Sequence, residues 1–108
     1  MTEQPKEINN VIAEKVMGWG IPHPCFEPYT NIAQALEALE EFCKRRRTHF
    51  ECVRVQGVDR AIWFVAIGTP GCIVGGDGQK YDIFRAEYEA DDEYLPAAIC
   101  EALIEWAL

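Results

Sequence analysis

Apolar side chains occupy both faces of the segment AIWFVAIG, Ala61 to Gly68, and few folds accommodate such a segment. An apolar run of this length between turn signals is typical of a strand in the interior of a sheet. Such a strand has neighbours on both sides and a packed layer against each face. We therefore expect Ala61 to Ile67 to be a central strand that is covered on both sides.

The segments around this strand have the period of two that strands show. Residues 50–56 alternate between two sides, with Val53 and Val55 on the same side. A short strand is expected at Cys72–Val74, between glycine-rich turns. Residues 81–90 alternate again. In that last segment the side chains expected to face inward are those of Phe84, Ala86 and Tyr88.

Three other segments repeat their apolar residues at spacings of three and four, which is the period of an amphipathic helix. The first is expected to end at Gly18. The second begins at Thr30 or Asn31, either of which can cap it, and ends in Lys44–Arg47. The third begins near Pro96. Their apolar stripes are Ile8, Val11, Ile12 and Val16; Ile32, Leu36, Leu39 and Phe42; and Leu95, Ile99, Leu103 and Trp106.

The predicted order is therefore α-α-β-β-β(β)-α, which defines an α+β fold. With 108 residues the chain has the size of one domain, spanning residues 1–108. A hydrophobic fraction of 49% is enough to bury a core and argues against disorder. We expect a small, mostly antiparallel sheet packed with helices, an α-β-α sandwich.

The formal net charge is −8, from 10 basic and 18 acidic residues. Direct binding to nucleic acid is not expected, because it requires Lys and Arg to replace the counterions of the phosphates. The simple interpretation of the acidity is solubility. The alternative interpretation is an acidic surface that mimics nucleic acid.

The five cysteines are scattered, and no two form a CxxC motif. This spacing does not indicate a zinc ribbon, a redox motif or a disulfide framework, so neither a metal, nor a cofactor, nor a disulfide is expected. The polar N-terminus lacks the apolar region of a signal peptide, and no apolar run approaches the length of a membrane span. We expect a reduced, cytoplasmic protein that does not interact with membranes.

The segments VIAEKVMGW, YTNIAQALEAL and LPAAICEAL together resemble the phage α-β-α sandwich domain family, which comprises small phage proteins of unassigned function. The first segment is the most distinctive of the three. The resemblance implies a three-layer fold, a phage or prophage origin and the cytoplasm of a bacterial host. It implies no catalytic residues.

Histidine is present only at His23 and His49, and serine is absent, so a Ser-His-acid triad is excluded. A Cys–His pair of His23 and Cys25 lacks the surroundings that would lower a thiol pKa. A zinc site of His23, Cys25, Cys43 and His49 would not have the spacing of a closed zinc module. We therefore expect no catalytic residues and no metal ligands.

Lys44–Arg47 is the only cationic cluster in this acidic chain. The favoured interpretation is a helix end whose cations offset the helix dipole. The alternative is a seat for a phosphate-like anion, because guanidinium groups bind phosphates in a bidentate manner. The residues of that candidate site are Arg45, Arg46, Arg47, His49 and Arg54.

The stretch KVMGWGIPHPCFEPYT connects the first two helices. Its glycines end the first helix, and its prolines stiffen the path to the second. We interpret it as structural, with Trp19 packed in the core. The alternative is that Trp19, Phe26 and Tyr29 form the wall of a ligand pocket.

Together these patterns predict a small phage or prophage accessory protein that acts by binding and not by catalysis. A host protein is the favoured partner. One alternative is sequestration of a small anionic, nucleotide-like signalling ligand in counter-defence, and another is the acidic nucleic-acid mimic. We also expect a homodimer, because an exposed sheet edge or face in so small a domain is readily buried by a second copy.

Overall fold

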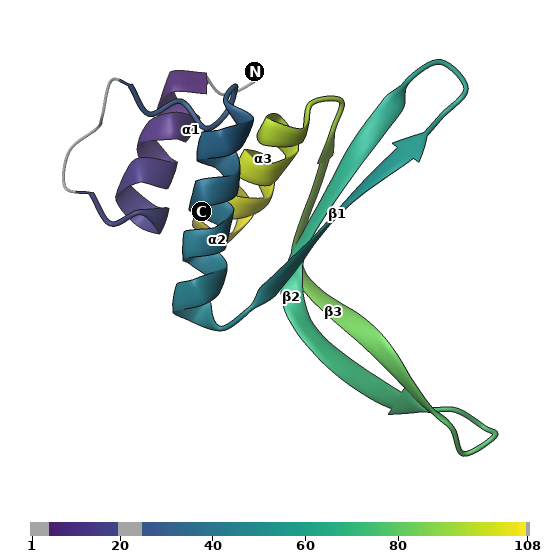
Figure 1. Cartoon of the computed structure of the whole chain (residues 1–108). Coiled ribbons are helices and arrows are strands. Elements are labelled where there is room, and N and C mark those ends of the chain that lie inside the picture. The colour runs from purple at the N-terminus through teal and green to yellow at the C-terminus, as the bar shows by residue number, and fades with distance from the viewer. Residues whose placement is uncertain (1–4, 20–24, 108) are drawn as a thin grey trace.

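A computed structural model describes residues 5–19 and 25–107, and its elements follow the order α-α-β-β-β-α (Figure 1). The α+β class and the order of the elements are thereby confirmed. The helical elements are α1 (Pro5–Val11), which continues as the π-helical turn η1 (Ile12–Val16), then α2 (Ile32–Arg46) and α3 (Leu95–Ala107). The strands are β1 (His49–Gln56), β2 (Ala61–Val74) and β3 (Lys80–Asp92).

The three strands form one antiparallel sheet in the order β1-β2-β3, so the apolar segment is the central strand, as predicted. β1 pairs with β2 from Ala61 to Gly68, whereas β3 pairs with β2 as far as Val74. The short strand expected at Cys72–Val74 is the far end of β2. Because β1 is shorter, β2 and β3 continue past it as a two-stranded ribbon (Figure 1).

The helices all lie on one side of the sheet (Figure 1). α3 packs directly on β2 and β3, and α1, η1 and α2 pack on α3. Residues 97–100, 102 and 103 of α3 are buried, so this helix is enclosed on most sides rather than along a single stripe. The layers are therefore the sheet, then α3, then the remaining helices. No helix in the described ranges 5–19 and 25–107 is long and apolar enough to cross a membrane.

The expectation that Ala61 to Ile67 is covered on both sides is wrong. Val65 and Ile67 are buried under α3, but Phe64, which points to the other face, remains 44% exposed. In the part of the chain that the structure describes, no element covers that face (Figure 1). The physical reason is that the helices pack on one another around α3, which leaves the sheet as an outer layer.

A second correction concerns the inward face of β3. Tyr88 pairs with Ile67 and packs against the core, but the register then shifts, and Ala86 pairs with Gly68. This β-bulge places one extra residue in β3 and reverses the alternation beyond it. As a result Ala86 is exposed, and Phe84 lies in the ribbon instead of the core.

The second helix begins as predicted from one of the two candidate caps. Asn31 has an extended backbone, and its Oδ1 accepts a hydrogen bond from the Gln34 backbone N–H at 3.1 Å. This bond satisfies one of the amide groups that the first turn of a helix leaves unpaired. Arg47 ends the helix in the left-handed conformation, with φ of 53°.

Gly68 allows β3 to approach closely at the bulge. A Cβ atom added there would lie 1.8 Å from the Arg85 carbonyl oxygen and 2.9 Å from Ala86 Cα. We expect Gly68→Ala to lower the free energy of unfolding by about 1–3 kcal/mol or more, because both obstacles are backbone atoms. Urea unfolding measures the change. Gly76→Ala is the matched control, since a Cβ there meets nothing within 4 Å; equal losses for the two variants would contradict the prediction.

Candidate binding surface

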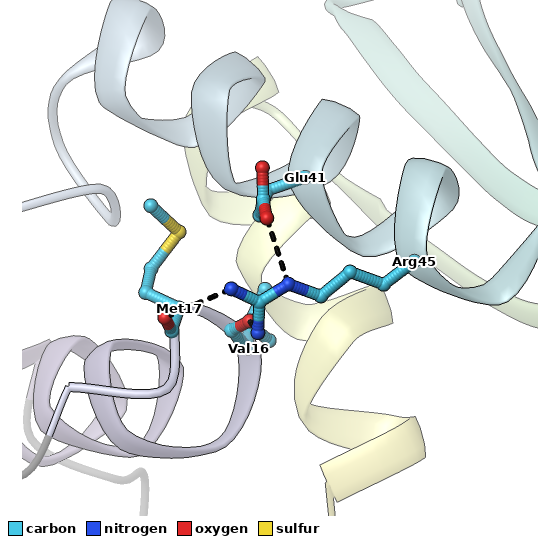
Figure 2. A network of polar contacts seen from close by, with 4 residues as sticks. All are labelled: Val16, Met17, Glu41 and Arg45. Carbon is cyan, nitrogen blue, oxygen red and sulfur yellow. Dashed lines mark hydrogen bonds and ion pairs between the residues drawn. The ribbon is translucent and has the colours of Figure 1, made fainter.

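Arg45 of the basic run is engaged within the fold. Its Nε donates to Glu41 Oε1 at 2.7 Å, and its Nη1 and Nη2 donate to the carbonyl oxygens of Val16 and Met17 at 3.3 and 3.4 Å (Figure 2). Those carbonyls lie at the C-terminal end of η1, where the backbone leaves acceptors unpaired and a cation is favourable. Arg45 therefore joins α2 to the end of η1.

The next two arginines also have local roles. The Arg46 guanidinium carbon lies 5.1 Å from the centroid of the Trp106 ring and 5.5 Å from that of Phe42, which is cation–π geometry. The two rings pack edge to face, with centroids 4.9 Å apart. Arg47 is the left-handed residue that ends α2. These contacts fit the favoured interpretation of the run as a helix end.

His49 and Arg54, the other members of the predicted anion site, lie on opposite faces of β1. His49 is paired with Gly68 and shares the uncovered face, whereas Arg54 is paired with Trp63 on the helix side. Both side chains are exposed. The structure thus spreads the predicted residues over a helix end and two sheet faces, and does not gather them in one pocket. Anion binding by part of the set stays a prediction.

Arg45 and Arg47 provide a matched pair for stability. Arg45→Gln should lower the free energy of unfolding by about 1 kcal/mol, because it removes an ion pair and a cation from a helix C-terminus. Arg47→Gln should change it by less than about 0.5 kcal/mol, since the side chain is exposed and the left-handed backbone is retained. Chemical denaturation compares the two variants. A larger loss of stability in Arg47→Gln than in Arg45→Gln would contradict the stabilising role of the Arg45 contacts.

The structure brings two of the three predicted pocket-wall aromatics together. The Trp19 and Phe26 rings pack edge to face with centroids 4.8 Å apart. They line a hollow of about 240 Å³ together with Cys25, Gln34 and Glu37. Phe26 is buried, and Trp19 packs against the core, as the structural interpretation of this stretch predicts.

Tyr29, the third aromatic, belongs to a different group of contacts. Its backbone N–H donates to Asn9 Oδ1 at 3.0 Å, and its hydroxyl donates to Glu101 Oε1 at 3.4 Å. Burial, together with the hydrogen bond and the charge of the adjacent Asp92 carboxyl, raises the pKa of Glu101 to about 7. Glu101 lies outside the apolar stripe predicted for this helix, and the sequence gave no sign of this environment.

The raised pKa of Glu101 makes stability depend on pH. The folded state favours the protonated carboxyl. The contribution of Glu101 to the free energy of unfolding is therefore complete below its ordinary pKa of 4.5, and it is lost as the pH rises through about 7. We expect Glu101→Gln, which stays neutral, to become increasingly stable relative to the wild type across that interval. Thermal unfolding at several pH values measures the difference. Glu105→Gln, at an exposed position of the same helix, is the control; parallel behaviour of the two variants would refute the assignment.

The uncovered side of the sheet presents an apolar patch bordered by acids, which we call the open sheet face. Val53, Phe64 and Asp91 form one cross-strand row. The patch consists of Val53, Val55, Ile62, Phe64 and Ala66, with Glu51, Glu89 and Asp91 at its border and His49 beyond Glu51 on the same face. The exposed fractions of Val53, Val55 and Phe64 are 50%, 46% and 44%. Large apolar side chains exposed together in this way are typical of an interaction site.

Two hollows mark this face. One, of about 460 Å³, is lined by Phe64, Val65, Ala66, Glu89, Ala90 and Asp91. The other, of about 320 Å³, is lined by Arg60, Ile62, Asp91, Asp92 and Glu93, and its Arg60 is paired with Glu93. In the paired rows of the open sheet face, the charged side chains are all carboxylates. The face can therefore accept apolar side chains in its centre and cations at its border.

Within the described part of the chain, no group of three His, Cys, Asp or Glu residues is placed to hold a metal ion. His23, which the considered Cys–His pair and zinc site both require, lies outside the described residues. All five cysteines are free thiols. Burial raises the pKa of the Cys43, Cys52 and Cys100 thiols.

A scan against protein-family models matches no family, and searches of curated proteins and of solved structures find no similar protein. The likeness to the phage family therefore stays a prediction based on three segments of the sequence.

Proposed function

We propose that this protein acts by binding a partner protein, without catalysis, and that the open sheet face is its docking surface. The observation that carries the proposal is the half-exposed apolar patch of Val53, Val55 and Phe64 on a sheet face that no described element covers. Burying such side chains stabilises a complex in proportion to the apolar area removed from water. The rigid strands hold the patch in shape before the partner arrives.

The charge of the face favours a basic partner. Glu51, Glu89 and Asp91 border the apolar patch, and the protein as a whole carries −8. Complementary charge accelerates association and selects among partners. Proteins that handle nucleic acid present Lys and Arg on their surfaces for the phosphates. A host protein of this kind is the partner that we propose, and the cytoplasm of a bacterial host is the proposed location of a phage or prophage accessory protein.

The basic residues support a protein partner over a small anion. Arg45 and Arg46 already bind carbonyl groups and aromatic rings of the same chain, and these contacts compete with any phosphate. The open sheet face, in contrast, has exposed apolar groups that gain from being covered.

The test uses Phe64→Ser and a matched control, Ile32→Ser, whose side chain in α2 is 41% exposed against 44% for Phe64. Proteins that the immobilised wild-type protein retains from nuclease-treated bacterial lysate are identified and purified. Each is then titrated calorimetrically against the wild type and each variant. We expect Phe64→Ser to weaken binding by at least about tenfold and Ile32→Ser to leave it unchanged. Circular dichroism confirms that both variants fold.

The acidic border is tested by Glu89→Gln, with the exposed Glu40→Gln of α2 as its control. Removal of a charge that contacts a basic partner should slow association and reduce its dependence on salt. The proposal is refuted if the purified partner binds Phe64→Ser and Glu89→Gln as tightly as it binds the wild type.

A further inference from the structure

The ribbon of β2 and β3 beyond the end of β1 projects from the body of the protein (Figure 1). We call its residues 69–85 the hairpin arm. Within the described residues, β1 stops pairing at Gly68, and the two remaining strands pair with each other up to Val74 and Lys80. The molecule measures 54 × 37 × 25 Å, and its radius of gyration is 15.5 Å. A compact chain of this length would have a radius of gyration of about 13 Å.

One face of the hairpin arm is apolar from its middle toward its tip. The register places Ile73 opposite Tyr81 and Gly71 opposite Ile83, so these side chains share a face, which we call the Ile73–Tyr81 face. Ile73 is 48% exposed and Tyr81 is 47% exposed. The opposite face pairs Val74 with Lys80, Cys72 with Asp82 and Pro70 with Phe84, so charged side chains interrupt its apolar surface.

A two-stranded ribbon is marginally stable in water unless something packs against it. The hairpin arm lies beyond β1, and its residues are absent from the buried core. Along its β2 edge the arm carries Pro70, which has no N–H to donate and disfavours the addition of another strand at that edge. The arm therefore gains most from a partner that covers its apolar face.

The charge of the hairpin arm favours a second copy of the chain as that partner. The arm contains two acidic residues, Asp77 and Asp82, and two basic residues, Lys80 and Arg85, so it is neutral and the net charge of −8 belongs to the rest of the molecule. Two bodies of that charge repel each other. Neutral arms that reach away from the bodies can associate while the bodies remain apart.

The charges at the two ends of the Ile73–Tyr81 face are also complementary to each other. At the tip, the Tyr81 hydroxyl donates to Asp77 Oδ2 at 2.7 Å. At the base, the Arg85 side chain lies beside Gly71, whose added Cβ would be 3.3 Å from Arg85 Nε. In a two-fold, antiparallel arrangement the tip of one arm meets the base of the other. Each Asp77 then faces the Arg85 of the second copy.

We propose that the protein forms a homodimer in which the Ile73–Tyr81 faces of two hairpin arms pack antiparallel. This assembly leaves the open sheet faces of both copies accessible. The dimer proposal therefore does not depend on the proposed function, and either proposal can be refuted while the other stands.

Sedimentation velocity of the full chain over a range of concentrations tests the proposal. The wild type should dimerise, and Ile73→Lys should raise the dimer dissociation constant by at least about tenfold, since it places an unpaired charge in the apolar contact. Val74→Lys is the matched control, because it adds the same charge to the adjacent, 65% exposed residue on the opposite face. A monomeric wild type, or equal weakening by both variants, would overturn the proposal.

The site of contact is tested by nuclear Overhauser effects in a mixture of isotope-labelled and unlabelled chains. Contacts between the Tyr81 ring of one copy and the Ile73 or Ile83 methyl groups of the other are expected. Intermolecular contacts from Phe64 or Val53 would instead place the dimer on the open sheet face and overturn the arm assignment.

Discussion

α3 is buried between the sheet and the other helices, and the remaining features of the molecule depend on this packing. Most of its buried residues are small or aliphatic, including Ala98, Ile99 and Ala102, which lets neighbouring elements approach closely. One helix therefore serves as the core for both the sheet and the helical layer. Because the described helices are all used in enclosing α3, the second face of the sheet is left to solvent.

The same packing determines how the few cations are used. Arg45 holds the end of η1, Arg46 covers Trp106 and Phe42, and Arg60 pairs with Glu93. Arg45 and Arg60 each neutralise one carboxylate, that of Glu41 and that of Glu93, and the basic run is held at the helices, so it does not offset the carboxylates that border the open sheet face. This links the internal structure of the basic run to the kind of partner that we propose for the open sheet face.

Local patterns were sufficient to predict the elements and their order. The spacing of apolar residues identified the helices, the Asn31 cap and the central strand, and the shared side of Val53 and Val55 agrees with the observed register. These features depend on residues that are close in sequence, so they can be predicted without knowledge of the tertiary structure.

The features that escaped prediction depend on distant packing. Phe64 is as apolar as Val65, and only the position of α3 makes one exposed and the other buried. The bulge beside Gly68 and the environment of Glu101 likewise arise where separate elements meet. The open sheet face was missed for this reason, since the sequence indicated how apolar its residues are but not how many helices would remain to cover them.

The unequal lengths of the strands have an evolutionary consequence. Since the hairpin arm joins the body only at its base, one residue can be added to each strand at opposed positions without a change in the core. An unmatched insertion in one strand would instead place side chains that now share a row on opposite faces, because neighbouring residues of a strand alternate and only one strand would be shifted. We therefore expect divergence in this protein to lengthen or shorten the arm by matched pairs of residues, while the spacing around Gly68 remains constant.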